Sequence, residues 1–301
     1  MANEVYKRQL SLLLNVLPEV AKETCFALHG GTAINLFVRN MPRLSVDIDL
    51  TYIPIEDRHS SITHISEALQ RIQRSIGKAI PGVQVIHRKE IGKLQISLAG
   101  AEIKVEVSLV GRGMIGNSQM LPLCNRAQDE FNVFCEMQIV PTSQLYGGKL
   151  CAALDRQHPR DLFDVKHLMA NEGISDAIKT GFIYCLVCSE RPLHEIIEPN
   201  LQDQRSAMEH HFAGMTKDVF TYAEYEEVRL QMIEKIQKSL THSDKNFLLS
   251  VANASPDWTY YNFEQFPAVA WKLQNLQKLK EVNITKHKHQ LEKLESLLKK
   301  L

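Results

Sequence analysis

One run of seven residues strongly limits how this chain can fold, because apolar and polar side chains alternate along it. In order these are Leu44, Ser45, Val46, Asp47, Ile48, Asp49 and Leu50. Successive side chains of a β-strand point to opposite faces, so the pattern predicts a strand with its apolar face in a core and its polar face in a cleft. Two carboxylates would then point the same way and repel each other unless a positive charge lies between them. Hard divalent cations such as Mg²⁺ take oxygen ligands of this kind and share them with substrate phosphates, so the spacing predicts a metal.

A short glycine motif, Gly30-Gly31-Thr32, comes before this strand and opens a segment with a helical pattern over residues 32–38. A helix start offers unpaired amide hydrogens and a positive dipole end to a phosphate, and glycine removes the side chain that would block its approach. Most such glycine pairs are only turns. Here Asp47 follows Gly31 by sixteen residues on a predicted strand. The combination predicts a metal-dependent enzyme that acts on nucleoside triphosphates (NTPs).

A third carboxylate, Glu106, lies in a second alternating run over residues 103–109. If this strand lies beside the strand with Asp47 and Asp49, Glu106 reaches the same cations. Two ions held by three carboxylates could activate an attacking hydroxyl and stabilise the leaving pyrophosphate. The alternative is that Glu106 is simply an exposed side chain on a half-buried strand.

The periodicity along the chain predicts two domains, and 301 residues are enough for both to have a core. We predict helices over residues 5–20 and 62–76, strands over 24–28, 44–53, 83–88, 93–98 and 103–110, and an irregular segment over 111–131. After Pro141 the patterns are almost all helical. We therefore predict an α+β protein, with a small mixed sheet and helices on one side over residues 1–140 and a mainly helical domain over 141–301.

The charge balance excludes a strong overall field toward nucleic acid or membrane, since Lys plus Arg and Asp plus Glu number 35 each. Any basic surface must be local, and the best candidate is the segment 272–301. No apolar run approaches the length that spans a bilayer, and the first residues lack the features of a secretory signal. We expect a cytoplasmic protein with free thiols and no membrane contact.

Two other groups of residues have a structural and a functional interpretation. Cys185 and Cys188 form a lone Cys-x-x-Cys in an apolar stretch, which favours a buried helix over zinc or redox chemistry. The aromatic cluster of Trp258, Tyr260, Tyr261 and Phe263 could stack on bases. Such clusters more often anchor a loop to a helical core.

In the helical part, Lys149 and Asp161 attract attention. A lysine facing the cleft would bind triphosphate oxygens as a point charge, and Asp161 near a helix start could hold that lysine or an arginine in place. On this pattern alone, the simpler interpretation is a surface helix with ordinary ion pairs.

Taken in order, four motifs resemble those of the AbiEii/AbiGii family. They are Gly30-Gly31-Thr32, Ser45-x-Asp47-x-Asp49, Lys149 and Arg160-Asp161-Leu-Phe-Asp164. Members of that family are DNA polymerase β-like nucleotidyltransferases that serve as toxins of bacterial toxin–antitoxin and phage-defence systems. The likeness spans roughly residues 25–170, and its specificity comes from the order of the motifs.

The resemblance implies a role for each matching residue. Asp47, Asp49, Lys149 and Asp161 would be catalytic; Gly30, Gly31, Thr32, Ser45 and Lys149 would bind the nucleotide; and Asp47, Asp49 and Glu106 would hold the metal. Ser45 also matches a serine at which some relatives are modified. Thr32 stands where many superfamily members have serine, and it keeps the hydroxyl.

The function implied is transfer of a nucleotide from an NTP to an acceptor, with Mg²⁺ or Mn²⁺ as cofactor. Transfer RNA is the acceptor expected by resemblance, and a cognate antitoxin is an expected partner. The residues leave two alternatives open. The acceptor could be a protein or a small molecule, or the chain could be a nucleotide-binding module without catalysis.

Overall fold

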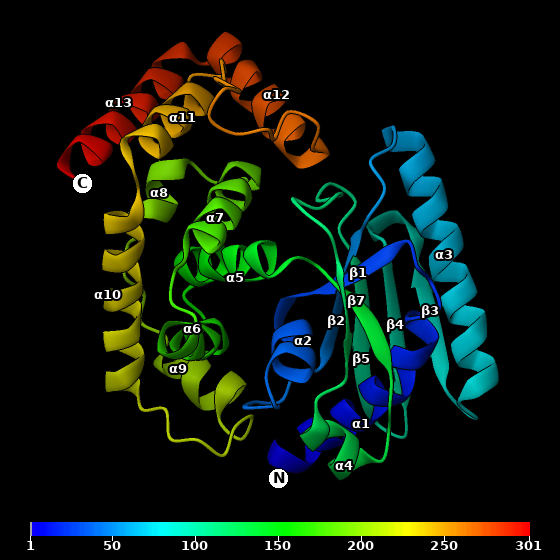
Figure 1. The fold of residues 1–301 in the computed structure, drawn as a ribbon. Helices are drawn as coiled ribbons and strands as arrows, with labels where there is room; N and C mark the ends of the chain where they lie inside the picture. Colours follow the sequence, from blue (N-terminus) through cyan, green and yellow to red (C-terminus); the bar gives the residue numbers. More distant parts are fainter. Residues whose placement is uncertain (1) are drawn as a thin grey trace. The chain divides into compact units, whose positions relative to one another are not determined.

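The computed structural model describes residues 2–301, and these form two compact units (Figure 1). The first unit runs to Pro141 and also includes Phe212–Val219, while the second comprises Thr142–His211 and Phe220–Leu301. The sequence indicated a single boundary near position 140. The chain instead returns to the first unit for eight residues, and each unit is described by itself below.

A mixed sheet of seven strands is the centre of the first unit. The strands are β1 (Phe26–His29), β2 (Asp47–Tyr52), β3 (Gln84–Arg88), β4 (Lys93–Leu98), β5 (Ala101–Val107), β6 (Gln119–Pro122) and β7 (Glu136–Ile139). Their order across the sheet is β3-β4-β5-β2-β1-β7-β6. The pairs β2–β5 and β1–β7 are parallel and the other neighbours are antiparallel, so the predicted mixed character is confirmed.

The segment expected to be irregular, residues 111–131, contains β6 and a helix, α4 (Asn125–Phe131). The expectation was wrong there because β6 carries no alternating apolar pattern. It is an edge strand with mostly exposed side chains, including Met120. Such a strand forms through its backbone pairing with β7, and the sequence gives little local sign of that pairing.

Helices lie on both faces of the sheet, whereas we expected them on one. Figure 1 shows α3 (Arg58–Ala79) on one side of the strands, and α2 (Gly30–Ala33) on the other. The first helix, α1 (Ala2–Val20), packs against β5 and α3. A π-helical turn, η1 (Ile34–Val38), continues α2, and a 3₁₀ turn, η2 (Lys89–Ile91), links β3 to β4.

The core of the first unit follows from the periodicity of its helices and strands. In α1 the side chains of Leu10, Leu13 and Leu17 are fully buried, at the spacing of one helix face. In β2 the side chains of Ile48 and Leu50 are fully buried, which is the predicted core face. The helix α3 begins earlier than predicted because Asp57 caps it, accepting hydrogen bonds from the amides of residues 59 and 60.

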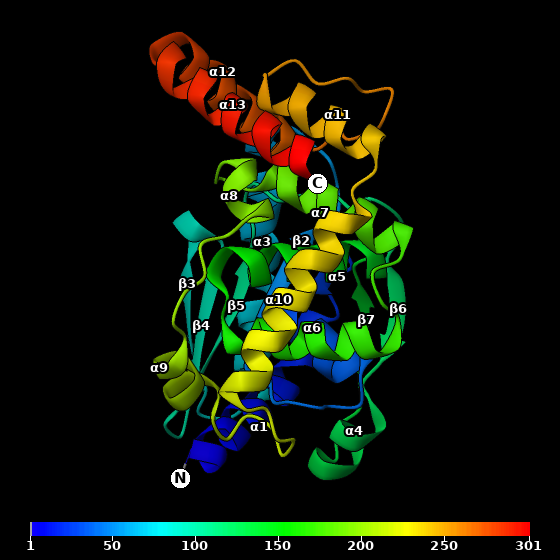
Figure 2. The ribbon, with the colours of Figure 1, turned by 90° about the vertical axis from the view of Figure 1, so that its left-hand side faces the viewer.

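The second unit is helical throughout, as expected. It contains α5 (Thr142–Arg156), α6 (Pro159–Asn171), α7 (Asp176–Cys188), α8 (Leu193–Ile197), α9 (Arg205–Ala207), η3 (Met208–Phe212), α10 (Tyr222–Ser239), α11 (His242–Ala252), α12 (Pro267–Val282) and α13 (Ile284–Lys300). Figure 2 shows α10 crossing α6, with which it is in contact, and α11, α12 and α13 gathered at one end of the unit. Within residues 2–301 no helix combines the length and apolar character that crossing a bilayer requires.

The aromatic cluster anchors a loop in this unit, as the simpler interpretation held. Tyr261 donates a hydrogen bond to Asp244 at 2.5 Å, and its ring stacks on that of Phe263 with centroids 5.0 Å apart. The Cys-x-x-Cys motif ends the apolar helix α7. Burial raises the pKa of Cys185 to about 12, so this sulfur is a thiol at neutral pH.

Helices α5 and α7 of the second unit cross at two glycines. A Cβ atom added to Gly147 would overlap the backbone of Gly181, and one added to Gly181 would overlap the carbonyl of Ser143. The two backbones therefore touch where no larger residue fits. The next residue, Gly148, differs, since its added Cβ would meet only the Cys185 sulfur at an ordinary 3.7 Å.

We expect Gly147→Ala to destabilise the protein by about 2 kcal/mol or more, because the methyl group forces the two helices apart. Gly148→Ala is the matched control on the same helix, and it should be neutral or should stabilise by up to about 1 kcal/mol through helix propensity. Denaturant unfolding followed by circular dichroism measures both. Equal stability of the two variants would show that the crossing tolerates a side chain.

Candidate active site

The glycine turn and the two aspartates lie side by side because β1 and β2 are antiparallel neighbours. In their register His29 is opposite Asp49, and Gly30 follows immediately with a φ of +73°. A Cβ atom on Gly30 would overlap the carboxylate oxygen Oδ2 of Asp49 and come within 3.3 Å of its Cβ. Position 30 therefore requires glycine for both its backbone conformation and its close approach to the carboxylate.

Thr32 ties this turn to the chain that enters β2. Its hydroxyl is fully buried and lies within hydrogen-bond distance of the Ser45 hydroxyl, at 3.0 Å, and of the backbone oxygen of Asp47. The Asn35 side chain adds a second brace by donating to the carbonyl of Gly31 at 2.9 Å. A hydroxyl at position 32 makes these contacts whether it comes from serine or threonine.

Arg43 is a residue of this site that the sequence did not single out. Its side chain is buried, and its Nη1 donates to the carbonyl of Leu44 at 2.9 Å. A Cβ atom on Gly31 would lie 2.8 Å from Nη2, so the guanidinium is beside the glycine turn. The sequence offered only an arginine two residues before Ser45, and no local pattern places its side chain beside Gly31.

The aspartates occupy the face of β2 that the alternation predicted. Asp47 and Asp49 are both half-buried on one face, opposite Ile48 and Leu50. The strand is shorter than predicted at its start, since it begins at Asp47 and leaves Leu44 half-buried outside it. Residues 44–46 lie outside the sheet. The backbone N–H of Leu44 donates a hydrogen bond to the carbonyl of Met215 at 2.7 Å.

Glu106 lies on the strand next to Asp49. The strands β2 and β5 are parallel neighbours, and Asp49 and Glu106 are register partners. The Glu106 carboxylate forms an ion pair with Lys93 Nζ at 2.5 Å and is partly exposed. The strand that carries Glu106 therefore lies beside the strand that carries Asp47 and Asp49, as a shared site requires. The role of Glu106 as a metal ligand stays a prediction.

The donor chemistry of Asp47 and Asp49 fits a hard divalent cation, because two carboxylates on one strand face offer oxygen ligands from one side. The Glu106 charge is already balanced by Lys93. Within residues 2–301 no group of three or more His, Cys, Asp or Glu side chains is gathered as around a metal. The two aspartates are thus the residues that would hold a cation here, together with the phosphates of a substrate.

Lys149 and Asp161 belong to the second unit, where they form a buried charge cluster. Lys149 on α5 places its Nζ 2.8 Å from Asp161 Oδ1 and 3.0 Å from Asp164 Oδ2, and all three side chains are buried. Arg156 adds two hydrogen bonds to Asp161, at 2.6 and 3.0 Å. The predicted contact between Asp161 and the lysine is present, and the alternative of a surface helix with ordinary ion pairs is wrong.

The helix α6 presents these aspartates because it begins at Pro159, with His158 as its cap. Burial and the nearby Arg160 charge lower the pKa of His158 to about 4, and its neutral ring accepts a hydrogen bond from the Arg160 amide. Burial alone would raise the pKa of Asp161. The positive charges of Lys149 and Arg156 outweigh that effect and hold the pKa of Asp161 below its ordinary value.

The family model described as "Nucleotidyl transferase AbiEii toxin, Type IV TA system" matches residues 11–275. Among solved structures, MenT4, a nucleotidyltransferase toxin from Mycobacterium tuberculosis H37Rv, is similar, with a TM-score of 0.63, 15% sequence identity, and coverage of 90% of this chain and 93% of that one. At this identity the likeness shows the fold. No curated protein matched.

We expect Lys149→Met to destabilise the protein by about 3–5 kcal/mol, since it leaves two buried carboxylates without their shared cation. Lys166→Met is the matched control. It breaks a half-exposed ion pair with Glu224, with Nζ and Oε1 2.6 Å apart, and should cost no more than about 1 kcal/mol. Denaturant unfolding at neutral pH measures both, and equal losses would contradict the buried cluster.

The pH dependence of the stability of wild type and Lys149→Met tests how the charge of Asp161 contributes to folding. Because the folded-state pKa of Asp161 is lowered, the ionised carboxylate stabilises the fold above the ordinary carboxyl pKa, and this contribution is lost as the pH falls. Protonation also relieves the carboxylate repulsion in Lys149→Met. The stability gap between wild type and this variant should therefore shrink below about pH 4. A constant gap would contradict the assignment.

Proposed function

The chain belongs to the AbiEii family of nucleotidyltransferase toxins of type IV toxin–antitoxin systems, and from this we propose that it transfers a nucleotide from an NTP to an RNA acceptor, with transfer RNA as the expected acceptor. The observation that carries the proposal is the contact between the Gly30 turn and the Asp49 carboxylate. It supports the proposal because the turn proposed to hold phosphates lies next to a carboxylate proposed to hold the cation, within the first unit.

In the proposed reaction an acceptor hydroxyl gives its proton to solvent and attacks the α-phosphorus of the NTP. The new P–O bond forms as the bond from the α-phosphorus to the oxygen that bridges it to the β-phosphorus breaks, and pyrophosphate leaves. Backbone amides at Gly31 and Thr32 would hold phosphate oxygens, and the Arg43 guanidinium beside Gly31 would balance their charge. Asp47 and Asp49 would hold a divalent cation, Mg²⁺ or Mn²⁺, which when bound polarises phosphate oxygens and lowers the pKa of the attacking hydroxyl.

The motif order of the family supports two further roles. We propose that Lys149 contacts the nucleotide and that Asp161 orients its ammonium through their 2.8 Å ion pair. The helical unit would shape acceptor choice. Use of cellular NTPs and RNA supports a cytoplasmic location, and the toxin–antitoxin family supports a cognate antitoxin as partner and a role in phage defence.

A second candidate keeps the chemistry and changes the acceptor to a protein side chain or a small molecule. The observation in its favour is the balanced charge of the chain, with 35 basic and 35 acidic residues, since RNA-binding proteins commonly carry excess positive charge. Fractionating the labelled products into RNA, protein and small molecules separates the candidates.

We expect Asp47→Asn and Asp49→Asn to reduce nucleotide transfer by roughly a thousandfold, because each removes a charged ligand of the proposed cation. The assay uses purified protein, each labelled NTP in turn, Mg²⁺ and total RNA, and growth arrest on expression is a parallel measurement. Transfer should also stop with a chelator and return with Mg²⁺ or Mn²⁺.

Glu102→Gln is the matched control, since Glu102 is an exposed carboxylate on β5 outside the proposed site. Glu106→Gln tests the third carboxylate separately. Full transfer by both aspartate variants would refute the catalytic proposal. A folded wild-type protein that labels no RNA with any NTP would refute the RNA acceptor.

A further inference from the structure

The eight residues 212–219 leave the helical chain and pack onto the segment that leads to the aspartates. Thr216 and Arg43 form an isolated antiparallel bridge, and the Thr216 hydroxyl donates to the carbonyl of Pro42 at 2.8 Å. Leu44 donates its N–H to the carbonyl of Met215 at 2.7 Å. This segment is thus fixed to the first unit by its backbone.

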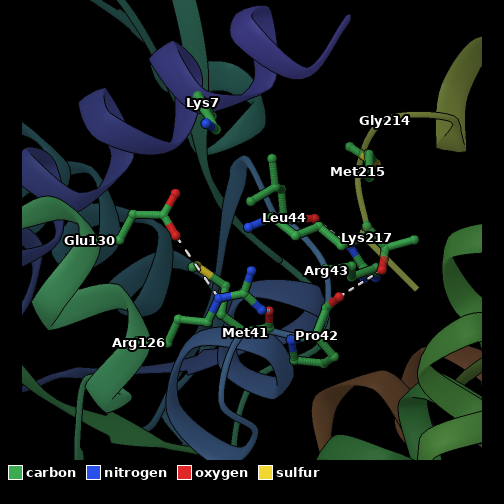
Figure 3. A pocket seen from close by; sticks show the side chains of 11 residues that line it. Lys7, Met41, Pro42, Arg43, Leu44, Arg126, Glu130, Gly214, Met215 and Lys217 are labelled. Carbon is green, nitrogen blue, oxygen red and sulfur yellow. Dashed lines mark hydrogen bonds and ion pairs between the residues drawn. The ribbon is translucent and has the colours of Figure 1, made fainter.

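A pocket lies where this segment meets α1 and α4 (Figure 3). Its lining residues, all from the first unit, are Lys7, Met41, Pro42, Arg43, Leu44, Arg126, Glu130, Gly214, Met215, Thr216 and Lys217. The cavity volume is about 30 Å³. That is about the room of two or three water molecules, which suits the two non-bridging oxygens of a phosphodiester.

Besides Arg43, three cationic side chains from three different elements line this pocket, against one carboxylate. Lys7 comes from α1, Arg126 from α4 and Lys217 from the returning segment. Figure 3 shows Arg126 beside Met41 and Glu130, with its ion pair to Glu130 drawn as a dashed line. An apolar floor that includes the half-buried Pro42 and Leu44 keeps water from one side, so charges at the rim are screened less than on an open surface.

These cations are only weakly engaged with acidic side chains. The ion pairs Lys7–Glu4 and Arg126–Glu130 are both long, at 3.9 Å. Lys217 is exposed, and no ion pair or hydrogen bond of its ammonium is found among the described residues. Arg126 is held in place by donating to the carbonyl of Met41 at 2.9 Å, which leaves other N–H groups of its guanidinium for an anion.

The pocket is also close to the aspartates along the chain. Arg43 lines it, and Asp47 is only four residues further on. Four fully extended residues span at most about 14 Å, so the two Cα atoms cannot be further apart. An RNA strand whose end lies at Asp47 would bring one of its next phosphates within reach of the pocket.

From these observations we propose that the pocket binds a backbone phosphate of the RNA acceptor, with Lys217 as its accessible cation. The inference rests on the proposed function and adds to it a site for the acceptor. A phosphate fits better than an acidic peptide, because four cations around one small recess, Arg43 included, match a compact anion. Phosphate contacts of this kind give affinity without sequence information, and they make binding sensitive to salt.

The test uses the full chain with Lys217→Glu, and Lys78→Glu as the matched control. Lys78 is an exposed lysine on α3 of the same unit, outside the pocket, so both variants change the net charge equally. Binding of fluorescently labelled transfer RNA is measured by anisotropy over a range of salt concentrations. Steady-state transfer is measured with NTP and RNA varied separately.

We expect Lys217→Glu to weaken RNA binding roughly three- to tenfold at about 0.1 M salt and to reduce the slope of log K against log salt by about 1. The KM for RNA should rise, while kcat and the KM for NTP stay as in wild type. Lys78→Glu should behave as wild type in every measurement.

Equal behaviour of the two variants, with wild type still labelling RNA, would overturn the pocket and leave the proposed function standing. A raised KM for NTP with RNA binding unchanged would assign the pocket to the donor nucleotide and would also overturn the inference. If the wild-type chain labels no RNA, the proposed function fails and the inference fails with it.

Discussion

The contact of the Asp49 carboxylate with the backbone of Gly30 is the constraint on which the first unit depends. It exists because β1 and β2 pair with His29 opposite Asp49, and because the chain turns at Gly30 with a positive φ. A shift of this register by one residue would turn Asp47 and Asp49 into the core and bring Ile48 out of it. The alternation of buried and half-buried side chains along β2 therefore fixes the register of the strand. The same alternation directs the carboxylates of Asp47 and Asp49 to the face opposite the core.

In the second unit the structure depends in the same way on the close crossing of α5 and α7. Gly147 sets the separation of these helices, and Lys149 follows two residues later on α5, where it meets Asp161 and Asp164 of α6. A buried lysine between two carboxylates is stable only if its partners are well placed, since desolvation of the charges must be offset by short ion pairs. Helix packing and the charge cluster thus depend on each other.

The sequence predicted what local periodicity can encode. The helix α1, the core face of β2 and the contact of Lys149 with Asp161 all follow from spacing or from motif order. The sequence missed features that depend on partners far along the chain. The edge strand β6 has no apolar alternation, and the hydrogen bond from Thr216 to Pro42 joins residues 174 positions apart. Arg43 was also missed, because no local pattern in the sequence places its guanidinium beside Gly31.

The most direct measurement is a crystal structure of the full chain grown with Mn²⁺ and a non-hydrolysable NTP analogue, with anomalous data collected to locate the metal. We expect an anomalous peak about 2.1 Å from carboxylate oxygens of Asp47 and Asp49, the distance usual for a small hard cation, with triphosphate oxygens on the backbone amides of residues 30–32. A bound nucleotide whose cation lies on other residues, or whose phosphates lie away from this turn, would contradict the account.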